Sequence, residues 1–166
     1  STLSADARQE LLWRIDRKEQ DFMKALQFAQ GLVVHVNVAD GNVVRGQSFE
    51  VTAQVFNTGP EPMTVNEVTL HVPQGWTATL KQGQPGAIAY NEAATLIYSV
   101  TVGPNARYSQ PYWKRSTAKG PGSDRYEIEI PEHHLLPWSP PDVTATIKYT
   151  AGGASASLNA PAYYRY

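Results

Sequence analysis

The sequence predicts a mainly β protein with one long helix at its N-terminus. Two observations carry this prediction: a helical repeat of apolar residues that stops near residue 30, and short runs beyond it in which apolar and polar residues alternate. Alternation with a period of two is typical of strands that bury one face, and about eight or nine such runs separated by turn residues indicate an antiparallel sandwich. We therefore expect a connecting amphipathic helix over residues 1–30 and an immunoglobulin-like β-sandwich domain over residues 31–166.

The expected helix covers residues 4–30. A mostly apolar stripe recurs at steps of three and four, formed by Leu12, Ile15, Glu19, Phe22, Leu26 and Ala29. Ser4 or Asp6 can cap its start, and Gly31 can supply the left-handed residue at which it stops. Two alternatives are open: the stripe packs on the helix's own domain, or it also packs against a neighbouring domain.

The strand pattern is clearest around the turn at Asn57-Thr58-Gly59-Pro60, where Asn and Gly accept positive φ and Pro removes a ladder donor. The run before this turn alternates from residue 49 to residue 56. The run after it, over residues 63–72, loses its parity near Asn66, which predicts a β-bulge. Further strands are expected over residues 32–38, 76–80, 94–102, 126–130, 143–149, 154–158 and 162–166.

Bulk composition narrows the classes of function. The net charge of −1 provides no basic field for nucleic acid or anionic membranes, and no apolar run reaches the roughly 20 residues that span a bilayer. The chain has no cysteine, which excludes disulfides and cysteine metal sites but leaves the redox compartment open. Because the first residue is Ser1 and a polar helix follows, we expect a piece of a longer protein without a signal peptide.

Metal binding and catalysis find little support in the residues. The strongest metal-ligand candidates are His133 and His134, together with Glu132. The side chains of adjacent residues on a strand point in opposite directions, so both histidines could bind one ion only from a loop. We expect the two histidines to be solvated, and no metal site is predicted. Glu127 and Glu129 share one face of a predicted strand and are interpreted as its solvated side. We expect no catalytic residue and no cofactor in this chain.

Four aromatic residues in the second half are the candidate ligand-binding residues: Tyr112, Trp113, Tyr126 and Trp138. Aromatic rings in loops can stack on sugars or anchor a partner protein. The alternative is that they seal an open end of the sandwich, because long proline-containing loops need a small core of their own. The sequence leaves both interpretations open.

The middle of the chain resembles a known accessory domain. From about residue 43 to residue 106 it is similar to the NPCBM-associated immunoglobulin-like domain of bacterial glycosidases and other secreted enzymes. The matching words are Phe56-Asn57-Thr58-Gly59, Val72-Pro73-Gln74-Gly75-Trp76 and Pro104-Asn105-Ala106.

A second resemblance covers nearly the whole chain and points to the C-terminal region of bacterial PIG-L/LmbE-type N-acyl deacetylases. The matching words are Ile15-Asp16-Arg17-Lys18-Glu19, Gln110-Pro111-Tyr112-Trp113 and Tyr164-Arg165-Tyr166. The resemblance implies a parent enzyme that is a zinc-dependent deacetylase of N-acetylglucosaminyl-type substrates and is extracytoplasmic, either periplasmic or secreted. The family's His-Pro-Asp-Asp zinc motif is absent here, so no catalytic residue carries over.

Together these resemblances predict a noncatalytic accessory domain. It would pack, through the N-terminal helix, on the catalytic domain of the same polypeptide or on another subunit. The alternative function is a carbohydrate-binding module that uses the four loop aromatics on a glycan. Neither reading involves nucleic acid or a membrane, and the sequence does not fix an oligomeric state.

Overall fold

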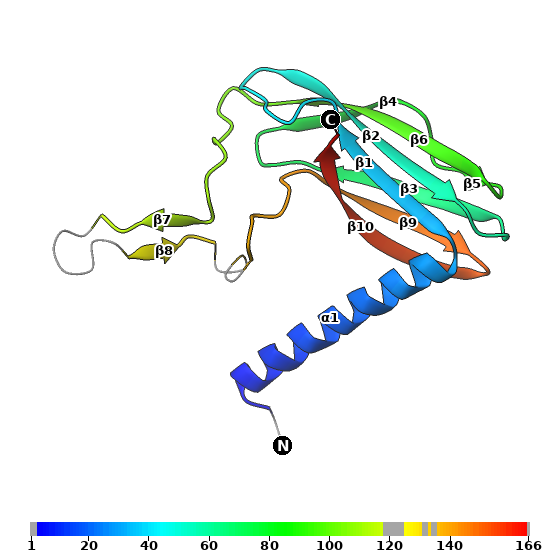
Figure 1. Cartoon of the computed structure of the whole chain (residues 1–166), viewed down its shortest axis with the longest axis horizontal. Helices are drawn as coiled ribbons and strands as arrows, with labels where there is room; N and C mark the ends of the chain where they lie inside the picture. Colours follow the sequence, from blue (N-terminus) through cyan, green and yellow to red (C-terminus); the bar gives the residue numbers. More distant parts are fainter. Residues whose placement is uncertain (1–2, 118–124, 131–132, 134–135, 166) are drawn as a thin grey trace.

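The computed structural model describes residues 3–117, 125–130, 133 and 136–165. One helix, α1 (Ala5–Ala29), and ten strands lie within them (Figure 1). The strands are β1 (Leu32–Val38), β2 (Ser48–Asn57), β3 (Met63–His71), β4 (Thr77–Gln82), β5 (Ala87–Ile88), β6 (Glu92–Thr101), β7 (Trp113–Arg115), β8 (Tyr126–Ile128), β9 (Thr144–Ala151) and β10 (Ala154–Tyr164). The expected mainly β fold with one N-terminal helix is confirmed.

Eight strands form one sheet that curls into a sandwich-like shape. Their order is β4-β6-β2-β1-β10-β9-β3-β5, and all neighbours are antiparallel except β1 and β10. The short parallel ladder between β1 and β10 joins two four-stranded halves, which lie over one another in Figure 1. The Tyr98 hydroxyl in β6 donates to the Val68 carbonyl in β3 at 2.8 Å and so ties the two halves across the core.

The core is built from the inward-facing residues of both halves. In β2 every second residue is buried, from Phe49 through Val51 to Val55, and β9 buries Ile147 and Tyr149 in the same way. A fully buried Val or Ile side chain stabilises the fold by about 1.5–3 kcal/mol. The strict alternation in the sequence therefore has a direct energetic cause.

Two details of the strands test the sequence interpretation. The bulge expected near Asn66 is confirmed, because the β3–β9 register shifts between Val65 and Glu67. The two strands expected over 154–158 and 162–166 are instead one strand, β10, which contains Pro161. The N–H of Ala162 donates to Val143 on the β9 side, so the nitrogen of Pro161 faces away from β9 and its missing N–H breaks no bond of that ladder.

The end of α1 is held by the turn that follows β2. The helix stops at Gln30, and Gly31 takes a positive φ of 69°. The carbonyl of Gly31 then accepts two hydrogen bonds from Thr58, one from its N–H at 2.8 Å and one from its hydroxyl at 2.7 Å. A Cβ atom on Gly59 would lie 2.2 Å from the Gln30 carbonyl oxygen, so this contact requires glycine.

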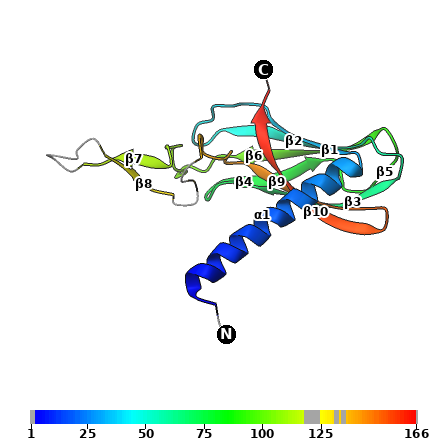
Figure 2. The ribbon, with the colours of Figure 1, turned by 60° about the horizontal axis from the view of Figure 1, so that its bottom comes forward.

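We call this contact of Gln30 and Gly31 with Thr58 and Gly59 the joint. Beyond the joint, α1 projects away from the sheet (Figure 2). Among the side chains of α1 that the structure describes, Met23 and Leu26, in its last turns, are partly buried against the core of the sandwich. Gln27 and Gln30 add side-chain hydrogen bonds to the carbonyls of Leu32 and Ala151. No helix in the described ranges is long and apolar enough to cross a membrane.

A second projection is the hairpin of β7 and β8, which we call the arm. Its strands pair with each other, with Trp113 opposite Ile128 and Arg115 opposite Tyr126. Figure 1 shows the arm extending from the end of the sandwich opposite the α1 joint. The connections that lead to it leave after β6 and return before β9.

Asn57 is the buried polar residue that shapes the turn beside the joint. Its side chain is fully buried, donates to the carbonyls of Glu61 at 2.8 Å and Ile88 at 3.2 Å, and accepts from the N–H of Gly59 at 3.0 Å. These three bonds satisfy backbone groups that the turn would otherwise leave unpaired.

Replacing Asn57 should therefore be one of the most damaging single changes in the sandwich. We expect Asn57→Ala to lower the free energy of unfolding by about 3 kcal/mol, because it leaves buried donors and acceptors without partners. Urea unfolding measures this. Glu61→Ala, in the same turn but exposed, is the matched control, and an equal effect of the two variants would contradict this role of Asn57.

Candidate functional site

The most prominent unpartnered surface lies on α1. Six large apolar side chains of α1 are exposed: Leu11, Leu12, Trp13, Ile15, Phe22 and Phe28. We call Leu11, Leu12, Ile15 and Phe22 the α1 stripe. Ile15 is 61% exposed and Phe22 is 73% exposed, although both belong to the helical repeat that normally marks a buried face. The stripe continues the side of α1 that packs on the sandwich at Met23.

Several charged side chains of α1 find partners on the helix itself. Arg14 pairs with Glu10, Lys18 pairs with Asp21 at 3.4 Å, and the Arg17 guanidinium lies 5.6 Å from the Trp13 ring centroid. These exposed pairs add little stability. Arg14 and Lys18 lie beside the α1 stripe, and their pairing along the helix leaves its apolar side chains uncovered.

The four aromatic residues predicted from sequence come together only in part. Trp113 and Tyr126 meet on the arm with ring centroids 4.8 Å apart and planes at 84°. The Tyr112 hydroxyl donates to the Leu136 carbonyl at 2.9 Å. Trp138 stands apart and is 81% exposed.

An edge-to-face pair is a packing arrangement, since it presents no continuous flat platform to a sugar ring. Ion pairs also link the two sides of the arm: the Lys114 ammonium lies 3.2 Å from the Glu129 carboxylate and 3.8 Å from that of Glu127. The hydrogen bond that Lys114 donates to Glu129, together with the negative charges of Glu129 and Glu127, raises the pKa of Lys114. Both rings stay exposed on the projecting arm, Trp113 by 40% and Tyr126 by 61%, so they do not seal the end of the sandwich, and ligand binding by them stays a prediction.

The metal candidates fall largely outside the described residues. Glu132 and His134 lie there, while His133 packs edge to face on Tyr112 with ring centroids 6.2 Å apart. Within the described ranges no three His, Cys, Asp or Glu side chains gather as a metal site.

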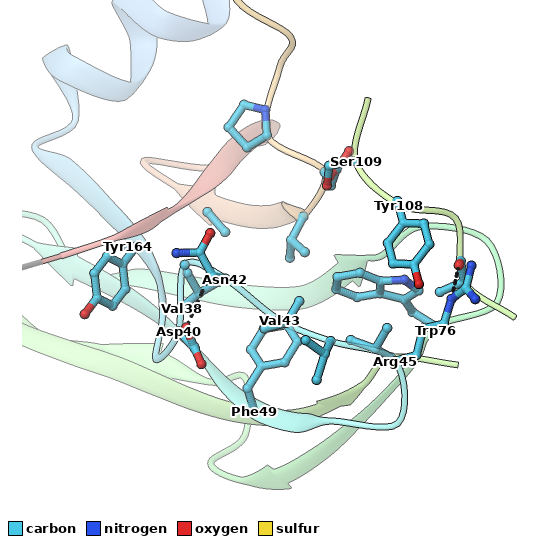
Figure 3. A pocket seen from close by; sticks show the side chains of 18 of the residues that line it. Val38, Asp40, Asn42, Val43, Arg45, Phe49, Trp76, Tyr108, Ser109 and Tyr164 are labelled. Carbon is cyan, nitrogen blue, oxygen red and sulfur yellow. Dashed lines mark hydrogen bonds between the residues drawn. The ribbon is translucent and has the colours of Figure 1, made fainter. Parts of the chain in front are cut away.

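A cavity of about 420 Å³ lies where the arm's connections leave the sandwich (Figure 3). Its apolar part contains Phe49 and Trp76, whose rings meet edge to face at 5.9 Å, with Val43 close by. Its rim carries polar groups from the loop between β1 and β2 and from both connections, including Asn42, Arg45, Ser109 and Asp142. A cavity of this size falls within the range of small-molecule sites, about 300–1,000 Å³.

Two rim residues are fixed by their neighbours. The Arg45 Nε donates to the Ala106 carbonyl at 2.8 Å, and its guanidinium lies 4.3 Å from the Tyr108 ring centroid. The Asp40 carboxylate accepts from the Asn42 N–H and from the Gln47 side chain, each at 3.0 Å. These hydrogen bonds, that of Asn42 first, lower the pKa of Asp40.

Sequence reasoning did not find this cavity. Neither the Asp40-Gly41-Asn42 segment nor Trp76 carries a sequence pattern that predicts a binding site. The available signal was the number of polar and aromatic residues in turns that flank β1, β2 and β6, but no sequence pattern shows that these turns share one end of the sandwich.

Comparison with known proteins gives one family match. A model of the NPCBM-associated, NEW3 domain of alpha-galactosidase matches residues 43–119. The match covers the region from β2 to β7 and confirms the first resemblance. It supports an accessory domain rather than a catalytic one. No curated protein matches the chain.

Three solved structures show weak likeness to the chain. The GAE domain of GGA2p from Saccharomyces cerevisiae has 10% identity and a TM-score of 0.47, covering 78% of this chain and 86% of that one. The GAE domain of yeast GGA1 has 13% identity and a TM-score of 0.46, covering 78% and 87%. The secreted serine protease VesC from Vibrio cholerae has 11% identity and a TM-score of 0.45, covering 81% of this chain and 23% of that one.

The arm should depend on its aromatic pair and the sandwich should not. We expect Trp113→Ala to remove amide-exchange protection in β7 and β8, because β7 and β8 pair only with each other in the described structure. The free energy of unfolding of the sandwich should change by no more than about 0.5 kcal/mol. Hydrogen exchange followed by NMR separates the two effects, and unchanged protection in β7 would contradict the prediction.

The hydrogen bonds to Asp40 make a second measurable prediction. Because its pKa is lower in the folded chain, its contribution to stability is present above the unfolded pKa and is lost as the pH falls through the folded pKa. NMR titration should therefore find a pKa for the Asp40 carboxyl below the ordinary value of an aspartic acid. Gln47→Ala should raise that pKa part of the way, since the Asn42 hydrogen bond remains. An unchanged Asp40 pKa in Gln47→Ala would contradict the contribution of the Gln47 hydrogen bond to the lowered pKa.

Proposed function

We propose that this chain is the noncatalytic accessory domain of a longer enzyme, and that α1 docks on the catalytic domain of the same polypeptide. The match to the NPCBM-associated, NEW3 domain supports the accessory role. The α1 stripe is the observation that carries the docking.

The stripe is suited to extend an interface that already exists. At Met23 and Leu26 the same side of α1 rests on the sandwich, and the exposed side chains of Ile15 and Phe22 continue it toward the N-terminus. A helix gains most of its stability from the packing of its apolar face. A domain packed on the α1 stripe would therefore stabilise the part of α1 that does not contact the sandwich.

The energetic scale favours a partner in the same polypeptide. Burying a Leu, Ile or Phe side chain contributes about 1.5–3 kcal/mol, so the stripe supplies a modest interface. A free partner must overcome the loss of translational and rotational freedom on association. A covalently linked domain avoids most of that cost because its effective concentration is high.

The proposed parent is a zinc-dependent N-acyl deacetylase of N-acetylglucosaminyl-type substrates, located outside the cytoplasm. This part of the proposal rests on the PIG-L/LmbE resemblance of the α1 and Gln110-Pro111-Tyr112-Trp113 segments. Zinc would belong to the catalytic domain, because its His-Pro-Asp-Asp motif is absent from this chain.

The docking is tested with the double variant Ile15→Asp/Phe22→Asp. In this chain alone the variant should change the free energy of unfolding by no more than about 0.5 kcal/mol, since both side chains are exposed. In the longer polypeptide it should free α1, and limited proteolysis should then cut between the two domains faster than in the wild type.

Lys24→Asp, an exposed position on the polar side of α1, is the control that should leave the proteolysis rate unchanged. A double variant that resists the protease as well as the wild type would rule out docking through the stripe. Deacetylation of an N-acetylglucosaminyl substrate by this chain alone, with zinc added, would rule out the noncatalytic role.

A further inference from the structure

The cavity at the root of the arm has the chemistry of a small-molecule site, and it is independent of the α1 stripe. We propose that it binds a neutral carbohydrate, one or two pyranose units in size. Three properties of its lining support this ligand: an aromatic and apolar interior, a rim of free hydrogen-bonding groups, and a balance of charge.

The interior offers surface for the C–H face of a sugar ring. Trp76 is partly exposed to the cavity and is held in place by its edge-to-face contact with buried Phe49. Tyr108 lines the same side, and the guanidinium of Arg45 holds its ring. Figure 3 shows both rings on one side of the space and Asn42 on the other.

The rim offers partners for hydroxyl groups. The side chains of Asn42, Ser109 and Asp142 make no hydrogen bond to protein in the described part of the chain. An amide, a hydroxyl and a carboxylate provide both donors and acceptors, which neighbouring hydroxyls of a sugar require. A purely apolar ligand would strip water from these groups without replacing its hydrogen bonds.

The charges around the cavity favour neither an anionic nor a cationic ligand. Asp40 and Asp142 carry two negative charges, and Arg45 and Arg107 carry two positive ones. The carboxylates disfavour phosphate or another anion, and the two guanidinium groups disfavour a cation. Asp40 also has a lowered pKa and stays an ionised acceptor, which suits binding rather than proton donation.

The four tryptophans allow the site to be located directly, because each occupies a different surface. Trp76 reports on the cavity, Trp13 on α1, and Trp113 and Trp138 on the arm and its connection. The indole N–H signals of the chain are followed by NMR while glucose, galactose, N-acetylglucosamine and their β-linked disaccharides are added. We expect at least one of these sugars to shift the Trp76 signal saturably, with Kd of about 1 mM.

Two variants test the assignment without touching the core. Asn42→Ala and Asp142→Asn change exposed side chains that make no hydrogen bond to protein in the described residues. Each should weaken binding about tenfold, because a hydrogen bond to a sugar hydroxyl is lost. Trp138→Ala is the matched control and should leave Kd unchanged.

Several outcomes would overturn the proposal. These are the absence of any saturable shift at Trp76 up to about 20 mM sugar, an unchanged Kd in both rim variants, and loss of binding in Trp138→Ala. Binding of adenosine in place of every sugar would also overturn it, since it would assign the cavity to flat heterocycles.

Discussion

The contact between the end of α1 and the turn after β2 is the constraint on which the arrangement of this chain depends. Gly31 and Gly59 approach so closely that a side-chain carbon on either would meet backbone atoms of the other segment, and Thr58 closes the contact with two hydrogen bonds. The side chain of Asn57 fixes the turn through three hydrogen bonds to backbone groups. One short motif therefore fixes both a strand end and the exit direction of the helix.

This joint explains how an apolar helix face can remain exposed. Because the backbone contact at Gly31 fixes the start of β1, α1 leaves the sheet at a set angle, and only Met23 and Leu26 reach the core. A flexible linker would let the helix fold back and bury Ile15 and Phe22 on its own sandwich. The rigid joint instead presents these side chains outward, which is the property that a docking element needs.

The parts of the fold that the sequence predicted are those decided by local patterns. The period of the apolar residues distinguishes α1 from β1, and the parity slip near Asn66 reports the bulge, because each depends on neighbours along the chain. The division of residues 154–166 into two expected strands was wrong, because a proline interrupts a strand only when its nitrogen faces a ladder, and only the sheet shows which side Pro161 faces. The cavity was missed for the same reason: Asn42, Trp76 and Asp142 come from turns that are distant in sequence and meet only after the sheet curls.

The joint from which α1 leaves the sandwich and the cavity lie at opposite ends of the same strands, whereas the α1 stripe lies further along the helix, which runs back beneath the sandwich in Figure 1. The pair Leu32–Asn57 marks the joint end of β1 and β2, whereas Val38 and Phe49 mark the cavity end. A strand of seven residues separates them by about 20 Å. The α1 stripe and the cavity share no residue, so a domain can dock on the stripe without using a side chain that lines the cavity. The same chain can thus present one surface to a catalytic domain and another to a ligand.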